Sequence, residues 1–198
     1  PNDMYPGEAV MPVVEIHSKW GTSEYRGNPN ALHKVNDLPS YAQDLLRQGL
    51  PLGFIGGTDS HATLTVGRGG VEHLDRLPGL TALKTKELNR SSIIEALKKR
   101  HCYAVSKDRI LLLPTLNGHA FGQTLTRDDS PRHIEAFVAG KADLLSVEII
   151  RNGEVIHTAS PKGWHATVTY TDMDSLDELL FDSSMHGKFV YYYIRVTC

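Results

Sequence analysis

The sequence predicts two domains, an α/β domain over residues 1–108 and a small antiparallel β-sandwich over residues 109–198. Predicted strands and helices alternate as far as about residue 105, which is typical of an α/β arrangement with parallel strands. After Asp108 about six short strands follow one another at the spacing of a sandwich. With 198 residues, of which 40% are apolar and 22% charged, the chain can build two small cores.

β-Branched runs, helix caps and glycines define the first elements of the α/β domain. Residues 13–16 are a β-branched run and predict a strand. The polar segment 19–39 contains several glycines and prolines and predicts a long loop, of the kind that often carries function. A helix is expected over residues 41–48, because Ser40 is a good N-cap and Gly49 a good terminator.

The rest of the α/β domain contains the clearest helix of the chain. This helix is expected to begin at Asn89 or Ser91, to bury one apolar face, and to close near His101. Three short apolar runs predict strands on either side of it, over residues 53–57, 80–84 and 103–105.

The second domain reads as an immunoglobulin-like sandwich. Its strands are expected over residues 110–116, 133–139, 146–150, 155–158, 165–170 and 189–196. Asn117-Gly118 predicts a turn, and Asn152-Gly153 between two β-branched runs is a strong hairpin signal. Residues 175–181 are expected to form one or two helical turns.

Composition argues against two classes of partner. The net charge is −2 and the basic residues are scattered, so no nucleic-acid surface is predicted. No run of 18 apolar residues occurs, so no membrane span is predicted. Cys102 and Cys198 could form a disulfide, but no CxxC metal pattern occurs.

The segment GFIGGTDSHA directs a predicted strand into an acid and an imidazole two residues apart, Asp59 and His61. On an extended chain, alternate side chains share a face, so the two would point to the same side. Active sites of α/β folds lie at the carboxyl ends of strands. A carboxylate and a neutral imidazole suit zinc, manganese or iron. The alternative is a capping aspartate beside an incidental histidine.

A second acid–imidazole pair, Glu15 and His17, ends the first predicted strand. The two residues are candidates for metal ligands, the alternative being a salt-bridged glutamate beside a loop histidine. Glu24 could accept hydrogen bonds from a ligand or position a base. Arg26 and Arg68 are candidate anion clamps, because a guanidinium binds phosphate or carboxylate with two hydrogen bonds, although each could also be a solvated loop charge.

The segments VVEIHSKWGTSE and LGFIGGTDSHA together resemble the PHP (polymerase and histidinol phosphatase) superfamily. They are most similar to its large bacterial PHP-like branch, which is related to carbaryl-hydrolase-like enzymes. The segment from Gly79 to Gly118 resembles the passage from the barrel of that branch into a terminal β-domain.

The resemblance implies that residues 1–108 are the C-terminal part of a distorted (β/α)7 barrel. Such a barrel holds two or three divalent metal ions and hydrolyses phosphate or related esters of small molecules. Asp59 and His61 match the terminal metal motif, and Glu15 and His17 match a position that lines the site.

The chain departs from the superfamily in having no His-x-His motif. The missing ligands are expected from an N-terminal half of the barrel or from a homo-oligomer partner, so this chain should bind metal weakly and turn over little substrate. A rival prediction is a binding module, a β-sandwich joined to a barrel remnant, with Trp164, Tyr170 and residues 191–193 as candidate contacts. A third possibility is that the chain is a purely structural C-terminal fragment with no separate function.

Overall fold

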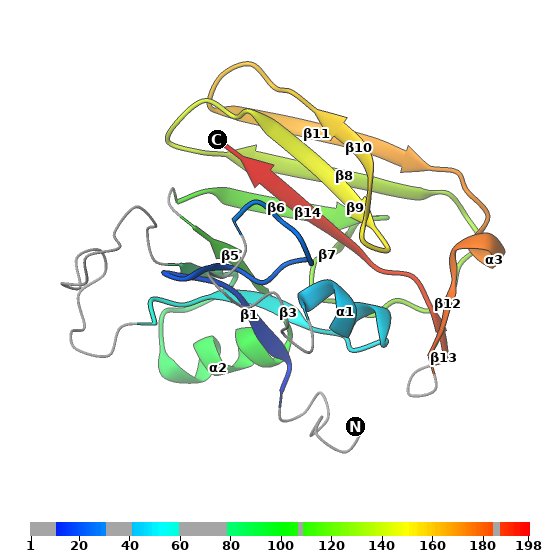
Figure 1. The fold of residues 1–198 in the computed structure, drawn as a ribbon, viewed down its shortest axis with the longest axis horizontal. Helices are drawn as coiled ribbons and strands as arrows, with labels where there is room; N and C mark the ends of the chain where they lie inside the picture. The colour runs from blue at the N-terminus through cyan, green and yellow to red at the C-terminus, as the bar shows by residue number, and fades with distance from the viewer. Residues whose placement is uncertain (1–10, 31–40, 60–78, 107–108, 184–186) are drawn as a thin grey trace. The chain divides into compact units, whose positions relative to one another are not determined.

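The computed structural model describes residues 11–30, 41–59, 79–106, 109–183 and 187–198 (Figure 1). The chain divides into two compact units. The first unit comprises residues 1–45 and 50–107, and the second comprises residues 46–49 and 108–198. No helix among the described residues is long and apolar enough to cross a membrane.

A three-stranded sheet of the first unit brings two parallel strands side by side. Its order is β2-β1-β3, formed by β1 (Val13–Ser18), β2 (Gly21–Thr22) and β3 (Gly53–Gly56). β2 returns antiparallel along β1, whereas β3 runs parallel to β1. The helix α1 (Ala42–Arg47) precedes β3 and ends before Gly49, whose φ of 86° lies in the left-handed region that glycine adopts without strain.

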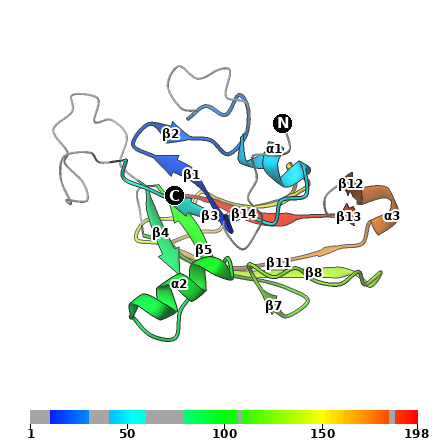
Figure 2. The ribbon, with the colours of Figure 1, turned by 90° about the horizontal axis from the view of Figure 1, so that it is seen from below.

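A β-hairpin with a helix inserted at its end forms the other part of the first unit. β4 (Leu80–Leu83) and β5 (Cys102–Val105) pair antiparallel, and the Lys84 N–H donates to the His101 carbonyl at 2.9 Å, which extends the ladder by one step. The helix α2 (Arg90–Lys98) therefore lies at the hairpin end, as Figure 2 shows. Asn89 is its N-cap, and Ser91 lies within the helix.

The predicted (β/α)7 barrel is wrong. The described residues form several small sheets and no barrel, and β1–β3 is the parallel strand pair among them. A strand–helix–strand pattern predicts a parallel crossover when the helix runs back along the sheet. Here the chain reverses direction across α2, because Leu83 pairs with Cys102 and the Lys84 N–H donates to the His101 carbonyl, so β5 returns antiparallel beside β4.

The second unit consists mainly of two antiparallel sheets, consistent with the predicted β-sandwich. One has the order β10-β9-β14 and the other β11-β8-β6-β7. Their strands are β6 (Leu111–Leu116), β7 (His119–Ala120), β8 (Arg132–Ala139), β9 (Ser146–Arg151), β10 (Glu154–Ala159), β11 (His165–Asp172) and β14 (Tyr192–Thr197). A short hairpin of β12 (Phe181–Ser183) and β13 (Gly187–Phe189) follows the helical turn α3 (Leu176–Leu179).

Alternation of side chains builds the core of the second unit. Along β8, Ile134, Ala136 and Val138 are buried, and the residues between them are more exposed. In the other sheet, Val147 and Ile149 of β9 are fully buried. Each strand therefore contributes one apolar face, as a two-layer β fold requires.

The two asparagine–glycine turns formed where they were predicted. Asn152 and Gly153, with φ of 55° and 89°, connect β9 to β10. Asn117 and Gly118, with φ of 49° and 78°, connect β6 to β7. Two successive positive φ values match the right-handed twist of paired strands, and asparagine and glycine are the residues that adopt them most readily.

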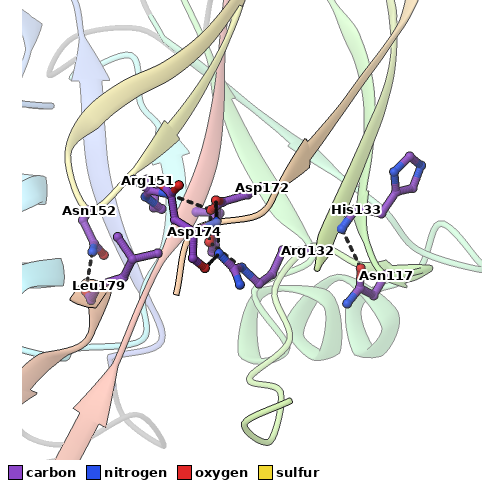
Figure 3. Close-up of polar contacts among 9 residues, drawn as sticks. Asn117, Arg132, His133, Arg151, Asn152, Asp172, Asp174 and Leu179 are labelled. Atoms are coloured by element: carbon purple, nitrogen blue, oxygen red, sulfur yellow. Dashed lines mark hydrogen bonds and ion pairs between the residues drawn. The ribbon is translucent and has the colours of Figure 1, made fainter. Parts of the chain in front are cut away.

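A buried ion network joins the two sheets of the second unit at one end (Figure 3). Asp172, at the end of β11, has no exposed surface. It pairs with Arg132 of its own sheet at 3.1 Å and with Arg151 of the opposite sheet at 2.8 Å. The Tyr192 hydroxyl donates to it at 2.7 Å, and the backbone N–H of Asp174 donates at 3.1 Å.

The network determines the charge state of Asp172. Burial by itself would raise the pKa of this carboxyl group, but the hydrogen bonds from Tyr192, Arg151, the Asp174 backbone and Arg132 outweigh it and hold the pKa at about 2. Burial and the neighbouring Asp172 charge raise the pKa of Tyr192 to about 12. Asp172 is therefore an anion, and Tyr192 a neutral donor, at every physiological pH.

Candidate metal centre

The carboxyl ends of β1 and β3 lie next to each other because the two strands are parallel. Val13 pairs with Gly53 and Glu15 with Ile55. Asp59 follows β3 by three residues, so its side chain leaves the chain at the same edge as the end of β1. Parallel pairing thus brings together two carboxylates that are 44 positions apart in the sequence.

An irregularity in the ladder orients Glu15. The register shifts between Glu15 and His17, because His17 pairs with Gly56 although Glu15 pairs with Ile55. A bulge of this kind changes the direction of a side chain at the end of a strand. The Glu15 carboxylate lies against Gly57, where a Cβ atom would collide with its Oε2. A side chain at position 57 would therefore displace the Glu15 carboxylate from this position.

Asp59 adopts a backbone conformation that the sequence did not predict. Its φ is 47°, in the left-handed region, so the chain is not extended there. The prediction that Asp59 and His61 share a face required an extended chain, and the backbone at Asp59 is not extended. His61 itself lies outside the described residues.

Two side chains from the end of β1 contact the Asp59 carboxylate. The indole N–H of Trp20 donates to Asp59 Oδ2, and the ammonium of Lys19 lies 3.8 Å from the same oxygen. Lys19 also lies over the Trp20 ring, 5.2 Å from its centroid. Trp20 was not predicted as a site residue, because only the pairing of β1 with β3 brings it near a residue 39 positions away.

The negative charge of Asp59 acts on the Glu15 carboxylate. Glu15 is an exposed residue as a whole, but partial desolvation of its carboxylate is the larger cause that raises its pKa, and the negative charge of Asp59 raises it further. No described residue forms an ion pair with the Glu15 carboxylate. A cation placed between Glu15 and Asp59 would relieve this repulsion, which is the electrostatic condition for binding a hard divalent ion.

The other predicted site residues lie at different places. His17 is partly exposed on β1, and its carbonyl accepts from the Gly57 N–H at 2.9 Å. Glu24 is buried after β2. Arg26 lies 5.0 Å from the centre of the Tyr41 ring and 4.0 Å from Asp44, at the start of α1.

Arg68 lies outside the described residues, so its role as an anion clamp stays a prediction. Within the described ranges, no group of three or more histidine, cysteine, aspartate or glutamate side chains could hold a metal ion. Glu15 and Asp59 offer two carboxylates of the type that binds a divalent ion, whereas a protein site normally has at least three ligands.

Three relatives from Chlamydia are similar to this chain over most of its length. An uncharacterized protein of Chlamydia pneumoniae is 35% identical over an alignment of 201 positions, which covers 93% of this chain and 32% of the relative. Uncharacterized proteins of Chlamydia trachomatis and Chlamydia muridarum are each 32% identical over 197 residues, with the same coverage. No family model matches the chain. No solved structure matches it either. The chain therefore spans about a third of the length of the chlamydial proteins that it resembles.

Proposed function

We propose that the chain contributes part of the metal centre of a divalent-metal-dependent hydrolase that acts on phosphate or related esters. The supporting observation is a pair of carboxylates on two adjacent parallel strands: Glu15 lies in β1 opposite the penultimate residue of β3, and Asp59 follows β3 by three residues. The resemblance of the segments around them to the PHP superfamily supports the reaction class. Membership of that superfamily is part of the proposal.

In this proposal Glu15 and Asp59 hold the metal ion, and His61, which lies outside the described residues, is a further candidate ligand. A bound divalent ion would polarise the ester and lower the pKa of a bound water. Gly57 allows the Glu15 carboxylate to approach, and Trp20 orients Asp59. The remaining ligands come from elsewhere in a longer protein or from a second copy of the chain, as the superfamily resemblance implies.

A metal titration tests the proposal directly. The 198-residue chain is titrated with Mn²⁺ by isothermal calorimetry, in parallel with Asp59→Asn and Glu15→Gln. Hydrogen-bond partners of metal ligands are worth about 10–100-fold in affinity, so loss of a ligand should weaken binding by about 100-fold or more. The matched control is Glu95→Gln, which removes the same charge from the exposed surface of α2.

Equal affinities for Asp59→Asn and Glu95→Gln would contradict the proposal. Hydrolysis of a chromogenic phosphodiester in the presence of Mn²⁺ is the second measurement. We expect little turnover by the chain alone. Fast turnover that Asp59→Asn abolishes would show that these 198 residues hold a more complete site than we propose.

The rival proposal, a binding module in the second unit, draws on exposed aromatic surface. Trp164 is 55% exposed and lies 4.2 Å from His165, centroid to centroid. The same titration separates the two proposals, because a binding module predicts no metal affinity that depends on Asp59.

A further inference from the structure

The two sheets of the second unit end in β7, β10, β11 and β14, and three of these edge strands are protected. β7 has only two residues. The register of β10 with its neighbour shifts between Val155 and His157. In β14, residues 192–196 are all half-buried. Short strands, register irregularities and cover are the features that keep a sheet edge from pairing with another chain.

β11 has none of these protections in the part of the chain that the structure describes. It pairs with β8 at eight consecutive positions without a register shift, and no described strand pairs with its other side (Figure 1). Residues 166–171 include no charge, proline or glycine, and four of them are β-branched. Every second side chain, from His165 to Thr171, is exposed. The outer edge of β11 is therefore a regular row of backbone donors and acceptors that another strand can pair with.

A shallow depression of about 300 Å³ lies beside this edge. Its lining consists of residues 166–169 of β11 together with His157, Ala159, Ser160 and Pro161. At one end the His157 ring stacks on Tyr170, 4.9 Å between centroids, and closes the space between the two sheets. A strand added to β11 would turn every second side chain toward this depression, because side chains alternate between the two faces of a sheet. The space suits a strand whose inward side chains are mostly small.

We propose that β11 pairs antiparallel with β11 of a second copy of this chain, about a twofold axis at Val168. This register turns the small side chains of Ala166 and Val168 inward beside the depression, which flanks the same part of the strand. It places Thr167 of each copy opposite Thr169 of the other, on the exposed face. Facing threonines stabilise a strand pair, and no like charges meet along the contact.

The twofold contact has a defined end point. It joins two four-stranded sheets into one sheet that continues through both copies. Both copies use the same surface, so the contact closes at two chains. The protected edges β7, β10 and β14 offer no comparable site for further growth. A contact seven residues long, about 24 Å at 3.4 Å per residue, belongs to the small interfaces, so we expect association in the micromolar range.

Sedimentation velocity of the 198-residue chain tests the inference, over concentrations from about 1 to 200 µM. The mass should rise from one chain to two and stop there. Thr167→Lys combined with Thr169→Lys places lysine opposite lysine at both symmetric positions, and should raise the dissociation constant by about tenfold or more. The matched control is Thr158→Lys, an exposed threonine on the irregular edge β10, which should dimerise as the wild type does.

A second double variant separates the contact from a general effect of charge on the strand. Thr167→Glu combined with Thr169→Lys places glutamate opposite lysine of the second copy at both positions, and should restore the wild-type dimer or a tighter one. The two double variants share the lysine at position 169 and differ only in the charge at position 167. Circular dichroism of both confirms that each chain folds.

The outcomes are decisive in either direction. A wild-type chain that stays monomeric at about 200 µM would overturn the inference, since the edge would then be open or covered by a different partner. A dimer that persists in the double-lysine variant would place the contact elsewhere, and a monomeric glutamate–lysine variant would exclude the twofold register. The inference goes beyond the proposed function, because β11 holds none of the candidate metal ligands. Asp59→Asn should dimerise as the wild type does, so the failure of either proposal leaves the other standing.

Discussion

Replacing Asp172 by asparagine should destabilise the second unit strongly, although the two side chains have almost the same shape. The substitution removes the negative charge between Arg132 and Arg151 at the position where the two sheets are joined (Figure 3). It also places an amide N–H₂ donor among groups that themselves donate. Two guanidinium groups would then lie partly buried without the anion that both now contact.

The structure sets the size of the effect. Removing one partner of a buried ion pair costs about 3–5 kcal/mol. Arg151 keeps a second carboxylate, Asp174, at 2.8 Å, and Arg132 keeps a hydrogen bond to the Asp174 carbonyl at 2.6 Å. These contacts compensate in part, so a loss near the lower end, about 3 kcal/mol in the free energy of unfolding, is expected.

Urea denaturation of the wild-type chain and Asp172→Asn measures this loss. The control is Asp129→Asn, which removes a carboxylate that also pairs with an arginine, Arg127 at 2.7 Å, but is 71% exposed. Its free energy of unfolding should equal that of the wild type within error, because exposed ion pairs contribute little. Equal losses in the two variants would refute the reasoning, since burial would then make no difference.

Acid gives a second, independent measurement of the same carboxylate. The pKa of Asp172 is about 2 in the folded chain and near 3.8 when unfolded. A depressed pKa stabilises the folded state above the unfolded value, and this stabilisation is lost as the pH falls from about 4 to 2. The difference in unfolding free energy between wild type and Asp172→Asn should therefore shrink by about 2 kcal/mol over that interval. A constant difference would contradict the assigned charge state.

Two further predictions concern the first unit. Asn89→Ala should lower the free energy of unfolding by about 1 kcal/mol in urea titrations, because the Asn89 side chain accepts the Ser92 N–H at 2.8 Å as the N-cap of α2. Ser91→Ala, within the helix, should leave the free energy of unfolding unchanged. A larger loss for Ser91→Ala than for Asn89→Ala would show that Asn89 is not the cap. Burial raises the pKa of the Cys102 thiol to about 11, so at pH 8 a thiol reagent should modify Cys198 first and Cys102 only slowly. Equal rates under native conditions would exclude a buried Cys102.

Local signals in the sequence predicted local structure well. Asn152-Gly153 gave a hairpin because its two positive φ values depend on those two residues alone. Asn89 was one of two predicted caps, and the choice over Ser91 depends only on the neighbouring turn. Such features need no knowledge of distant parts of the chain.

Features that depend on pairing between distant segments were not predicted. The pattern of strand, helix and strand over residues 80–105 is the same for a parallel crossover and for a hairpin that carries a helix, and the pairing of Leu83 with Cys102 decides between them. The ion network around Asp172 also depends on pairing between distant segments. Arg132 and Asp172 lie 40 positions apart, and only the antiparallel register of β8 and β11 places them opposite each other.

The candidate metal centre combines both kinds of feature. The sequence identified Glu15 and Asp59 as separate acids, each beside a histidine, because acids at strand ends are a local pattern. That they lie near each other depends on two non-local features, the parallel pairing of β1 with β3 and the register shift after Glu15, and on the left-handed backbone at Asp59. The contact of Trp20 with Asp59 depends on the same pairing.

The number of ligands links the metal centre to the length of the relatives. The described residues supply two carboxylates at this edge, whereas divalent ions in proteins usually have four to eight ligands, some of them water. The chlamydial relatives are about three times as long as the region that they share with this chain. On the proposed function, the Mn²⁺ affinity of the isolated chain therefore measures how much of the site it holds. Millimolar affinity that Asp59→Asn removes would mean that most ligands lie elsewhere, and micromolar affinity would mean that further ligands, with His61 the first candidate, come from this chain itself.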